Sequence, residues 1–105
     1  MRDRDPFAEC VGFDWDDGNA IKNWERHRVT PEEAEDVFFH DPLICRSDPS
    51  HSDNEKRYWA LGRTGRNRRL FVAFAIRNQL IRVISVRDMT RRELEGYERA
   101  EKSDS

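Results

Sequence analysis

The second half of the sequence is rich in side chains that bind phosphate. Residues 56–92 contain 11 Lys and Arg residues against one acidic residue, Asp88. Arginine suits phosphate because its planar guanidinium group donates two parallel, charge-assisted hydrogen bonds to neighbouring oxygens. The composition therefore favours a polyanion as binding partner, with nucleic acid as the commonest case. The candidate cationic side chains are Lys22, His27, Arg63, Arg77, Arg82, Arg87, Arg91 and Arg92.

A cationic site of this kind could cleave RNA by using the 2′-hydroxyl of the substrate as the nucleophile. The reaction needs a base for that hydroxyl, cations for the charged phosphorane and an acid for the departing 5′-oxygen. His27 is a candidate for proton transfer because histidine titrates near neutrality, and Tyr97 or an arginine could assist. The alternative for His27 is a structural role at a helix C-terminus. Trp24, Tyr58 and Trp59 could stack nucleobases, or they could pack in the core.

The charges are distributed unevenly along the chain. Residues 1–55 carry 6 basic and 15 acidic side chains, a balance of −9, whereas residues 56–105 carry 13 and 6, a balance of +7. This asymmetry fits a polyanion-binding surface. The alternative is that the two halves neutralise each other within the fold.

Metal-binding and nucleotide-binding motifs are absent from the sequence. It has no Walker loop, no G-x-G-x-x-G, no H-E-x-x-H and no paired C-x-x-C. His40 with Asp41, and His51 with Asp53, are weak metal candidates because neither pair has a helical partner or a cysteine at ligand spacing. Cys45 lies in an apolar stretch without an obvious base, so we expect a structural thiol. We therefore predict no metal and no cofactor.

The size and composition predict one small folded domain. The chain has 105 residues and a mass of 12.5 kDa. Leu, Ile, Val and Phe together number 22 of 105, just above the level of about 20% below which disorder is expected. We expect a loose N-terminal arm over residues 1–10, a single domain over 11–100 and a frayed tail over 101–105.

Capping signals predict three helices. A cluster of aspartates at positions 14, 16 and 17 supplies an N-cap and first-turn acids for a helix over about 17–28. Thr30-Pro31-Glu32-Glu33 is a capping box that starts a second helix, which ends before Asp41-Pro42. Thr90-Arg91-Arg92-Glu93 is another capping box and starts a C-terminal helix.

Alternating and continuous apolar runs predict the strands. A short strand occupies residues 11–15, and four further strands occupy 43–47, 56–62, 70–76 and 80–88. The fold class is α+β, with an antiparallel sheet formed by a four-strand meander plus the short N-terminal strand, two N-terminal helices and one C-terminal helix. We expect the helices mainly on one side of the sheet, which leaves the other side for basic residues. Strict alternation places Arg82 and Arg87 on opposite faces unless a bulge intervenes.

Several of these segments together resemble BrnT-type toxins, over about residues 12–100. In the first half the similar segments are Phe13-Asp14-Trp15-Asp16, Lys22-Asn23, His27, Pro31-Glu32-Glu33-Ala34, Val37-Phe38 and Asp41-Pro42. In the second half they are Arg57-Tyr58-Trp59-Ala60-Leu61-Gly62-Arg63, Ile81-Arg82-Val83-Ile84-Ser85-Val86-Arg87, and Thr90-Arg91-Arg92-Glu93 with Tyr97.

The resemblance implies a RelE/ParE-like fold and a ribonuclease toxin of a type II toxin–antitoxin module. It implies a BrnA-type antitoxin with a ribbon-helix-helix domain as partner, in a complex of two toxins and two antitoxins. Operator DNA would be bound only through that antitoxin. The matched positions implied to lie in the RNA cleft are Lys22, His27, Arg63, Arg82, Ser85 and Arg87.

Residues and resemblance together predict a metal-independent endoribonuclease that inhibits translation. No apolar run approaches the ~18 residues of a membrane span, and the two cysteines fit a reducing compartment, so we expect a cytoplasmic protein. The alternatives are a non-catalytic antitoxin-binding co-repressor and a ParE-like poison of DNA gyrase. The predicted catalytic residues are Lys22, His27, Arg63, Arg82, Arg87 and Tyr97, and the predicted substrate-binding residues are Arg57, Trp59, Arg77, Ser85, Arg91 and Arg92.

Two features depart from the family pattern. Trp24 is bulkier than the residue expected at its position, and the segment Gly65-Arg66-Asn67-Arg68-Arg69 is unusually basic. This basic segment could strengthen RNA binding or move the contact with the antitoxin.

Overall fold

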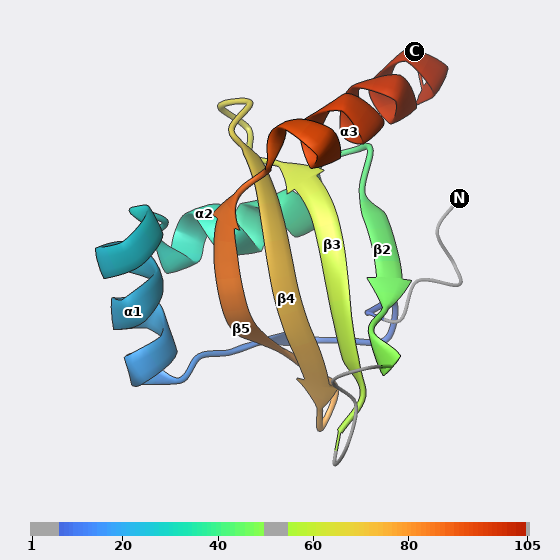
Figure 1. Ribbon diagram of the computed structural model, residues 1–105. Helices are drawn as coiled ribbons and strands as arrows, with labels where there is room; N and C mark the ends of the chain where they lie inside the picture. The colour runs from blue at the N-terminus through green and yellow to red at the C-terminus, as the bar shows by residue number, and fades with distance from the viewer. Residues whose placement is uncertain (1–6, 50–54, 105) are drawn as a thin grey trace.

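The computed structural model describes residues 7–49 and 55–104 and shows an α+β fold (Figure 1). Five strands form one sheet in the order β1-β5-β4-β3-β2. The elements in chain order are β1 (Gly12–Asp14), α1 (Asp17–His27), α2 (Pro31–Asp36), the 3-10 helix η1 (Val37–Phe39), β2 (Ile44–Ser47), β3 (Arg57–Arg63), β4 (Arg69–Arg77), β5 (Leu80–Asp88) and α3 (Arg91–Asp104). No helix among the described residues has the length and apolar character needed to cross a membrane.

The sheet is mixed, which corrects the prediction of an antiparallel sheet. Strands β2 to β5 pair antiparallel in sequence order, as the predicted meander requires. Strand β1, however, pairs parallel with β5, with Gly12 opposite Leu80. This strand is only three residues long because Asp16 becomes the N-cap of α1, where its carboxylate accepts a hydrogen bond from the Asn19 backbone N–H.

The hydrophobic core lies between one face of the sheet and the segment that contains α2 and η1. Ala34, Val37 and Phe38 from this segment are buried against the sheet residues Val72 and Phe74. The Phe38 and Phe74 rings meet edge to face with centroids 5.3 Å apart. The capping box predicted at Thr30 and Glu33 is present and starts α2. The thin predicted core is therefore concentrated on a single face of the sheet.

Helix α3 packs on the opposite face, at one end of the sheet (Figure 1). Glu101 accepts hydrogen bonds of 2.9 and 3.1 Å from Arg69, and Glu93 pairs with Arg87 at 2.8 Å. Both arginines alternate with core residues of β4 and β5, so they lie on the face that α2 does not cover. Helix α3 continues to Asp104, and Glu101 is held by Arg69.

The predicted N-terminal arm is only partly described. Residues 1–6 lie outside the described part of the chain, and Phe7 packs edge to face on Phe38 with centroids 5.3 Å apart. The Cys10 backbone N–H donates to the Phe7 carbonyl, and Val11 donates to Gln79. Residues 7–10, the described end of this segment, therefore contact the domain.

A β-bulge in β5 changes the faces of its residues. Ala73 of β4 pairs with Ser85, but the next residue, Phe74, pairs with Val83, so Ile84 is an extra residue. The bulge places Arg82, Ser85 and Arg87 on the same face, where strict alternation would have separated the two arginines.

Helix α1 covers the edge of β5 beyond the short β1. Asn23 is buried, and its side-chain oxygen accepts a hydrogen bond from the Val86 backbone N–H at 3.2 Å. An uncovered strand edge presents unpaired backbone groups. Asn23 therefore replaces part of the strand pairing that β1 does not extend far enough to supply.

Replacing Asn23 by Ala is expected to lower the free energy of unfolding by about 1–3 kcal/mol, because the Val86 N–H would stay buried without an acceptor. Chemical denaturation of the purified protein measures the change. Asn19→Ala, on the same helix and without a side-chain hydrogen bond, should change stability by less than about 0.5 kcal/mol. Equal effects of the two substitutions would contradict the role assigned to Asn23.

Candidate functional site

The sheet face opposite α2 carries most of the predicted site residues, and we call it the open face. The strand register arranges its residues in rows across β3, β4 and β5. The first row holds Arg57, Ala75 and Arg82, the second holds Trp59, Ala73 and Ser85, and the third holds Leu61, Phe71 and Arg87. Arg63 and Arg69 form a further row at the end covered by α3.

Many of the cations on this face are paired with acidic residues of the same chain. Arg87 binds Glu93 in two hydrogen bonds of 2.8 and 3.1 Å, and Arg77 binds Glu55 at 2.8 Å. The Arg77–Glu55 pair joins the basic and acidic halves of the sequence, as the predicted alternative requires, whereas Arg87 and Glu93 both belong to the basic half. Ion pairs at partly exposed positions contribute only about 0–1 kcal/mol, so a polyphosphate can compete for such arginines.

Arg82 is held more loosely than Arg87. Its guanidinium nitrogens lie 4.0 Å from an Asp14 carboxylate oxygen and 3.7 Å from one of Asp16, which is beyond hydrogen-bond distance. Five residues along a strand that rises about 3.3 Å per residue separate Arg82 from Arg87 by roughly 15 Å. The acidic residues near them lie at opposite ends of β5, with Asp14 and Asp16 near Arg82 and Glu93 beside Arg87. The two arginines are therefore placed to contact different phosphates of an extended strand rather than one.

Helix α1 brings Lys22 and His27 alongside β5. The start of the helix lies near Arg82, since Asp16 faces that side chain, and its end lies near Asp88. Lys22 is exposed, next to the buried Asn23, and no hydrogen bond or ion pair with other described residues engages its side chain. The site residues thus come from two sources, the open face and the helix that flanks it.

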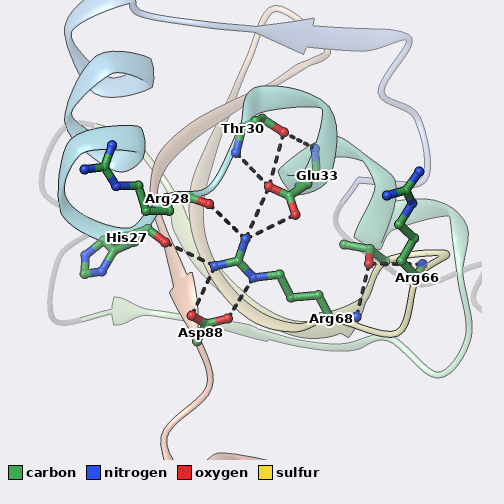
Figure 2. A network of polar contacts seen from close by, with 8 residues as sticks. His27, Arg28, Thr30, Glu33, Arg66, Arg68 and Asp88 are labelled. Carbon is green, nitrogen blue, oxygen red and sulfur yellow. Dashed lines mark hydrogen bonds and ion pairs between the residues drawn. The ribbon is translucent and has the colours of Figure 1, made fainter.

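The Arg68 guanidinium group is the centre of a polar network (Figure 2). It donates to both carboxylate oxygens of Asp88 at 2.8 and 3.1 Å and to Glu33 at 3.1 and 3.3 Å. It also donates to the backbone carbonyls of His27 at 3.1 Å and Arg28 at 2.9 Å. These contacts can use all five N–H groups of an arginine. Arg68 therefore joins the end of α1, the start of α2 and the end of β5.

The network shifts the pKa values of its acids. The hydrogen bonds from Arg68 lower the pKa of Asp88, with a smaller contribution from the nearby His27 ring. Burial raises the pKa of Glu33, but hydrogen bonds from the Thr30 backbone N–H and from Arg68 outweigh burial and lower it overall. Both carboxylates are thereby kept ionised and paired in the folded protein.

The basic segment 65–69 has a structural role that the sequence did not indicate. Arg68 holds three elements together and Arg69 holds α3 through Glu101. No local motif marks these partners, because they lie about 20 to 41 positions away in the sequence. Both side chains are engaged by partners within the fold.

The remaining predicted residues lie away from the centre of the open face. Tyr97 is fully buried, and its hydroxyl donates to the Pro42 carbonyl at 2.7 Å. Arg63 donates to the Asp41 carbonyl at 2.9 Å. Arg91 and Arg92 are exposed in the first turn of α3, and their side chains form no hydrogen bond or ion pair with other described residues.

The metal candidates are only partly described. His40 lies 3.1 Å from Asp36, one helical turn away, whereas His51 and Asp53 lie outside the described residues. Within residues 7–49 and 55–104 there is no group of three His, Cys, Asp or Glu side chains arranged to hold a metal ion.

Three side chains of the open face, from two neighbouring rows, contact one another: Trp59, Phe71 and Arg87. The Trp59 and Phe71 rings stack with centroids 6.2 Å apart and an interplanar angle of 22°. The Arg87 guanidinium carbon lies 4.1 Å from the Phe71 ring centroid. Phe71 was missed by sequence reasoning because it sits in a continuous apolar run, which gives no sign of which face each residue occupies.

The fold and the open face define a small α+β protein with a cationic sheet surface. A family model described as ribonuclease toxin, BrnT, of type II toxin-antitoxin system matches residues 15–93. The match spans more than half of the chain, so the chain belongs to this family of ribonuclease toxins, as the resemblance predicted. A comparison with curated proteins found no match.

Arg68→Ala is expected to lower the free energy of unfolding by about 2–4 kcal/mol, because hydrogen bonds to charged groups contribute about 1.5–3 kcal/mol each and several are lost together. Arg68→Lys should not restore stability, since an ammonium group lacks the planar fork. Arg66→Ala, in the same hairpin with an exposed side chain, is the control and should change stability by less than about 0.5 kcal/mol. A loss no greater than that of the control would show that the network is dispensable.

Stability should decline in acid. The pKa values of Asp88, Glu93, Asp36 and Glu33 are all lowered in the folded protein, so the unfolded chain takes up more protons as the pH falls. Their contribution is complete above the unfolded values of about 4 and is lost as the pH falls through the lower folded values. Denaturation series between neutral pH and pH ~3 measure this loss. Arg68→Ala should show a shallower pH dependence, because Asp88 and Glu33 lose their partner, and an unchanged dependence would refute the assignment.

Proposed function

We propose that this chain is a metal-independent endoribonuclease that cleaves RNA through the substrate's own 2′-hydroxyl and thereby inhibits translation. The observation that carries the proposal is the bulge at Ile84, which aligns Arg82, Ser85 and Arg87 on one face. Helix α1 adds Lys22 and His27 along the same strand. Membership of a ribonuclease toxin family supports RNA cleavage by this arrangement.

The proposed reaction has two proton transfers. A base removes the proton from the 2′-hydroxyl, and the 2′-oxygen attacks the adjacent phosphorus in line with the 5′-oxygen. The bond from phosphorus to the 5′-oxygen then breaks, and an acid protonates the departing oxygen. The products are a 2′,3′-cyclic phosphate and a free 5′-hydroxyl. Cations stabilise the phosphorane charge in place of a metal ion.

We assign proton transfer to His27. Its ring points away from the Arg68 network, while its backbone carbonyl is the group that Arg68 binds (Figure 2). The proposed proton transfer therefore uses the His27 side chain, whereas the contact with Arg68 uses the His27 backbone carbonyl. Lys22 and Arg87 supply positive charge near the same strand, and Ser85 lies between the two arginines of the open face.

The other cations are proposed to bind flanking phosphates. Arg82 lies too far along β5 to share a phosphate with Arg87, and we assign it to a neighbouring phosphate. The same role is proposed for Arg57, Arg63, Arg77, Arg91 and Arg92, with Trp59 stacking on a base. For Tyr97 we propose a positioning role, because its buried hydroxyl fixes α3 against the Pro42 carbonyl.

As a member of a type II toxin family, the chain has an antitoxin as its partner. We propose a BrnA-type ribbon-helix-helix antitoxin, two copies of each chain in the complex, and a RelE/ParE-like fold for this chain. The antitoxin would cover the open face with acidic and apolar side chains and so exclude RNA. It would also connect the complex to operator DNA in the cytoplasm.

The decisive experiment measures cleavage of single-stranded RNA by the purified chain in excess EDTA. We expect cleavage with 2′,3′-cyclic phosphate ends, and a fall in kcat of about 10²- to 10⁴-fold in His27→Ala, the range typical of a lost general acid or base. The stability of His27→Ala should stay close to that of the unaltered protein, because the backbone contact with Arg68 remains. Arg66→Ala is the charge-loss control and should cleave normally.

Three results would overturn the proposed mechanism. Activity that is lost in EDTA and restored by Mg²⁺ or Mn²⁺ would show that a metal is required. Antitoxin binding without any RNA cleavage would favour the non-catalytic co-repressor, and DNA damage with intact RNA would favour a gyrase poison.

A further inference from the structure

The open face contains a hollow of about 270 Å³ beside the contacting side chains of Trp59, Phe71 and Arg87. Its walls come from strands β3, β4 and β5 and from the end of β2. This volume is below the range of about 300–1,000 Å³ typical of sites for drug-sized ligands, so it suits a single flat group. The lining residues are Asp48, Arg57, Tyr58, Phe71, Ala73, Phe74 and Ile84.

The bulge and a small residue together account for the hollow. Ile84 is the extra residue of the bulge, so it lines the hollow without a partner on β4. Ala73 occupies the middle row between Trp59 and Ser85, where a larger side chain would fill the space. Phe71 forms one wall, and its ring is held by contacts with both Trp59, at a centroid distance of 6.2 Å, and the Arg87 guanidinium carbon, 4.1 Å from the ring centroid.

The chemistry of the lining favours a nucleobase over a phosphate. Asp48 is one of the lining residues and its negative charge disfavours a phosphate group, whereas Phe71, Ala73 and Ile84 offer an apolar surface to a flat ring. Positive charge stands on both sides, at Arg57 and Arg87, where the phosphates of a bound strand would lie. Grooves that bind single strands combine these same two elements, aromatic stacking and flanking cations.

We propose that the hollow is a nucleobase subsite, in which one base of single-stranded RNA inserts over Ala73 and packs beside Phe71. The proposal rests on the proposed function, since it assumes that RNA lies across the open face. It assigns Phe71, Ala73 and Ile84 to substrate binding, and it makes the bulge responsible for both the cation row and the base site.

The test measures binding of a short single-stranded RNA that carries 2′-O-methyl groups, which prevent cleavage, and a fluorescent 2-aminopurine at one position. Ala73→Leu fills the hollow without changing any charge, and Ala8→Leu is the matched control, the same substitution at an exposed position outside the open face. We expect Ala73→Leu to raise the dissociation constant about 5- to 100-fold, as loss of a stacked base does, and to abolish the fluorescence change. Phe71→Leu should also raise the dissociation constant, and Ala8→Leu should bind normally.

The salt dependence of affinity separates a base site from a phosphate site. Ala73→Leu should leave the slope of log affinity against log salt unchanged, whereas Arg82→Ala should reduce it by about 0.7, the value for one phosphate of a single strand. Unchanged affinity in Ala73→Leu, or a reduced slope in that variant, would overturn the base subsite. The proposed mechanism is tested separately: unmodified RNA that is bound in the hollow but left intact would refute cleavage and not the subsite.

Discussion

The Arg68 guanidinium group is the interaction on which the arrangement of this protein depends. Its donors hold the last carbonyls of α1, the capping carboxylate of α2 and the carboxylate at the end of β5. Those three chain segments meet only through tertiary contacts, and a core with few large apolar residues does little to fix them. The five donors of one planar group therefore fix the relative positions of these segments, which a larger core would fix by packing. Because α1 carries Lys22 and His27, the same group also sets where these two residues lie along β5.

Acidic side chains of the same chain neutralise part of the cationic open face. Arg87 and Arg77 are paired with Glu93 and Glu55, and under the proposed function phosphate oxygens would replace these carboxylates. Such pairs are weak at partly exposed positions, and exchange of a carboxylate for a phosphate costs little. Arg68 is different, because its five donors are directed at partners in three elements and leave no group for a ligand. Surface arginines and structural arginines are thus distinguished by the number and depth of their contacts, and not by their place in the sequence.

The bulge at Ile84 links the electrostatic and the apolar parts of the candidate site. It returns Arg87 to the face of Arg82, and it places an unpaired Ile84 beside the small Ala73. Helix α3 then closes one end of that face through Glu93 and Glu101, which leaves the hollow near Arg57 open. One inserted residue in β5 therefore determines the line of cations and the space between them.

The sequence by itself determined the local elements and the family. The capping boxes at Thr30 and Thr90 followed from short-range signals, because cap and partner lie three positions apart. The strand Leu80–Asp88 and the meander from β2 to β5 followed from apolar patterns within each segment. The family resemblance followed from motifs that the matching residues 15–93 confirm.

Only the tertiary structure decided the parallel pairing of β1, the side on which α3 packs, the bulge and the role of Arg68. Each depends on residues distant in the sequence, such as Arg68 with His27 and Arg69 with Glu101. An alternating pattern predicts faces only while the register is unbroken, so an extra residue at Ile84 reverses the prediction without leaving a local sign. The charge counts could not distinguish a binding arginine from a structural one, because that difference lies in which partners the folded chain brings within hydrogen-bond distance.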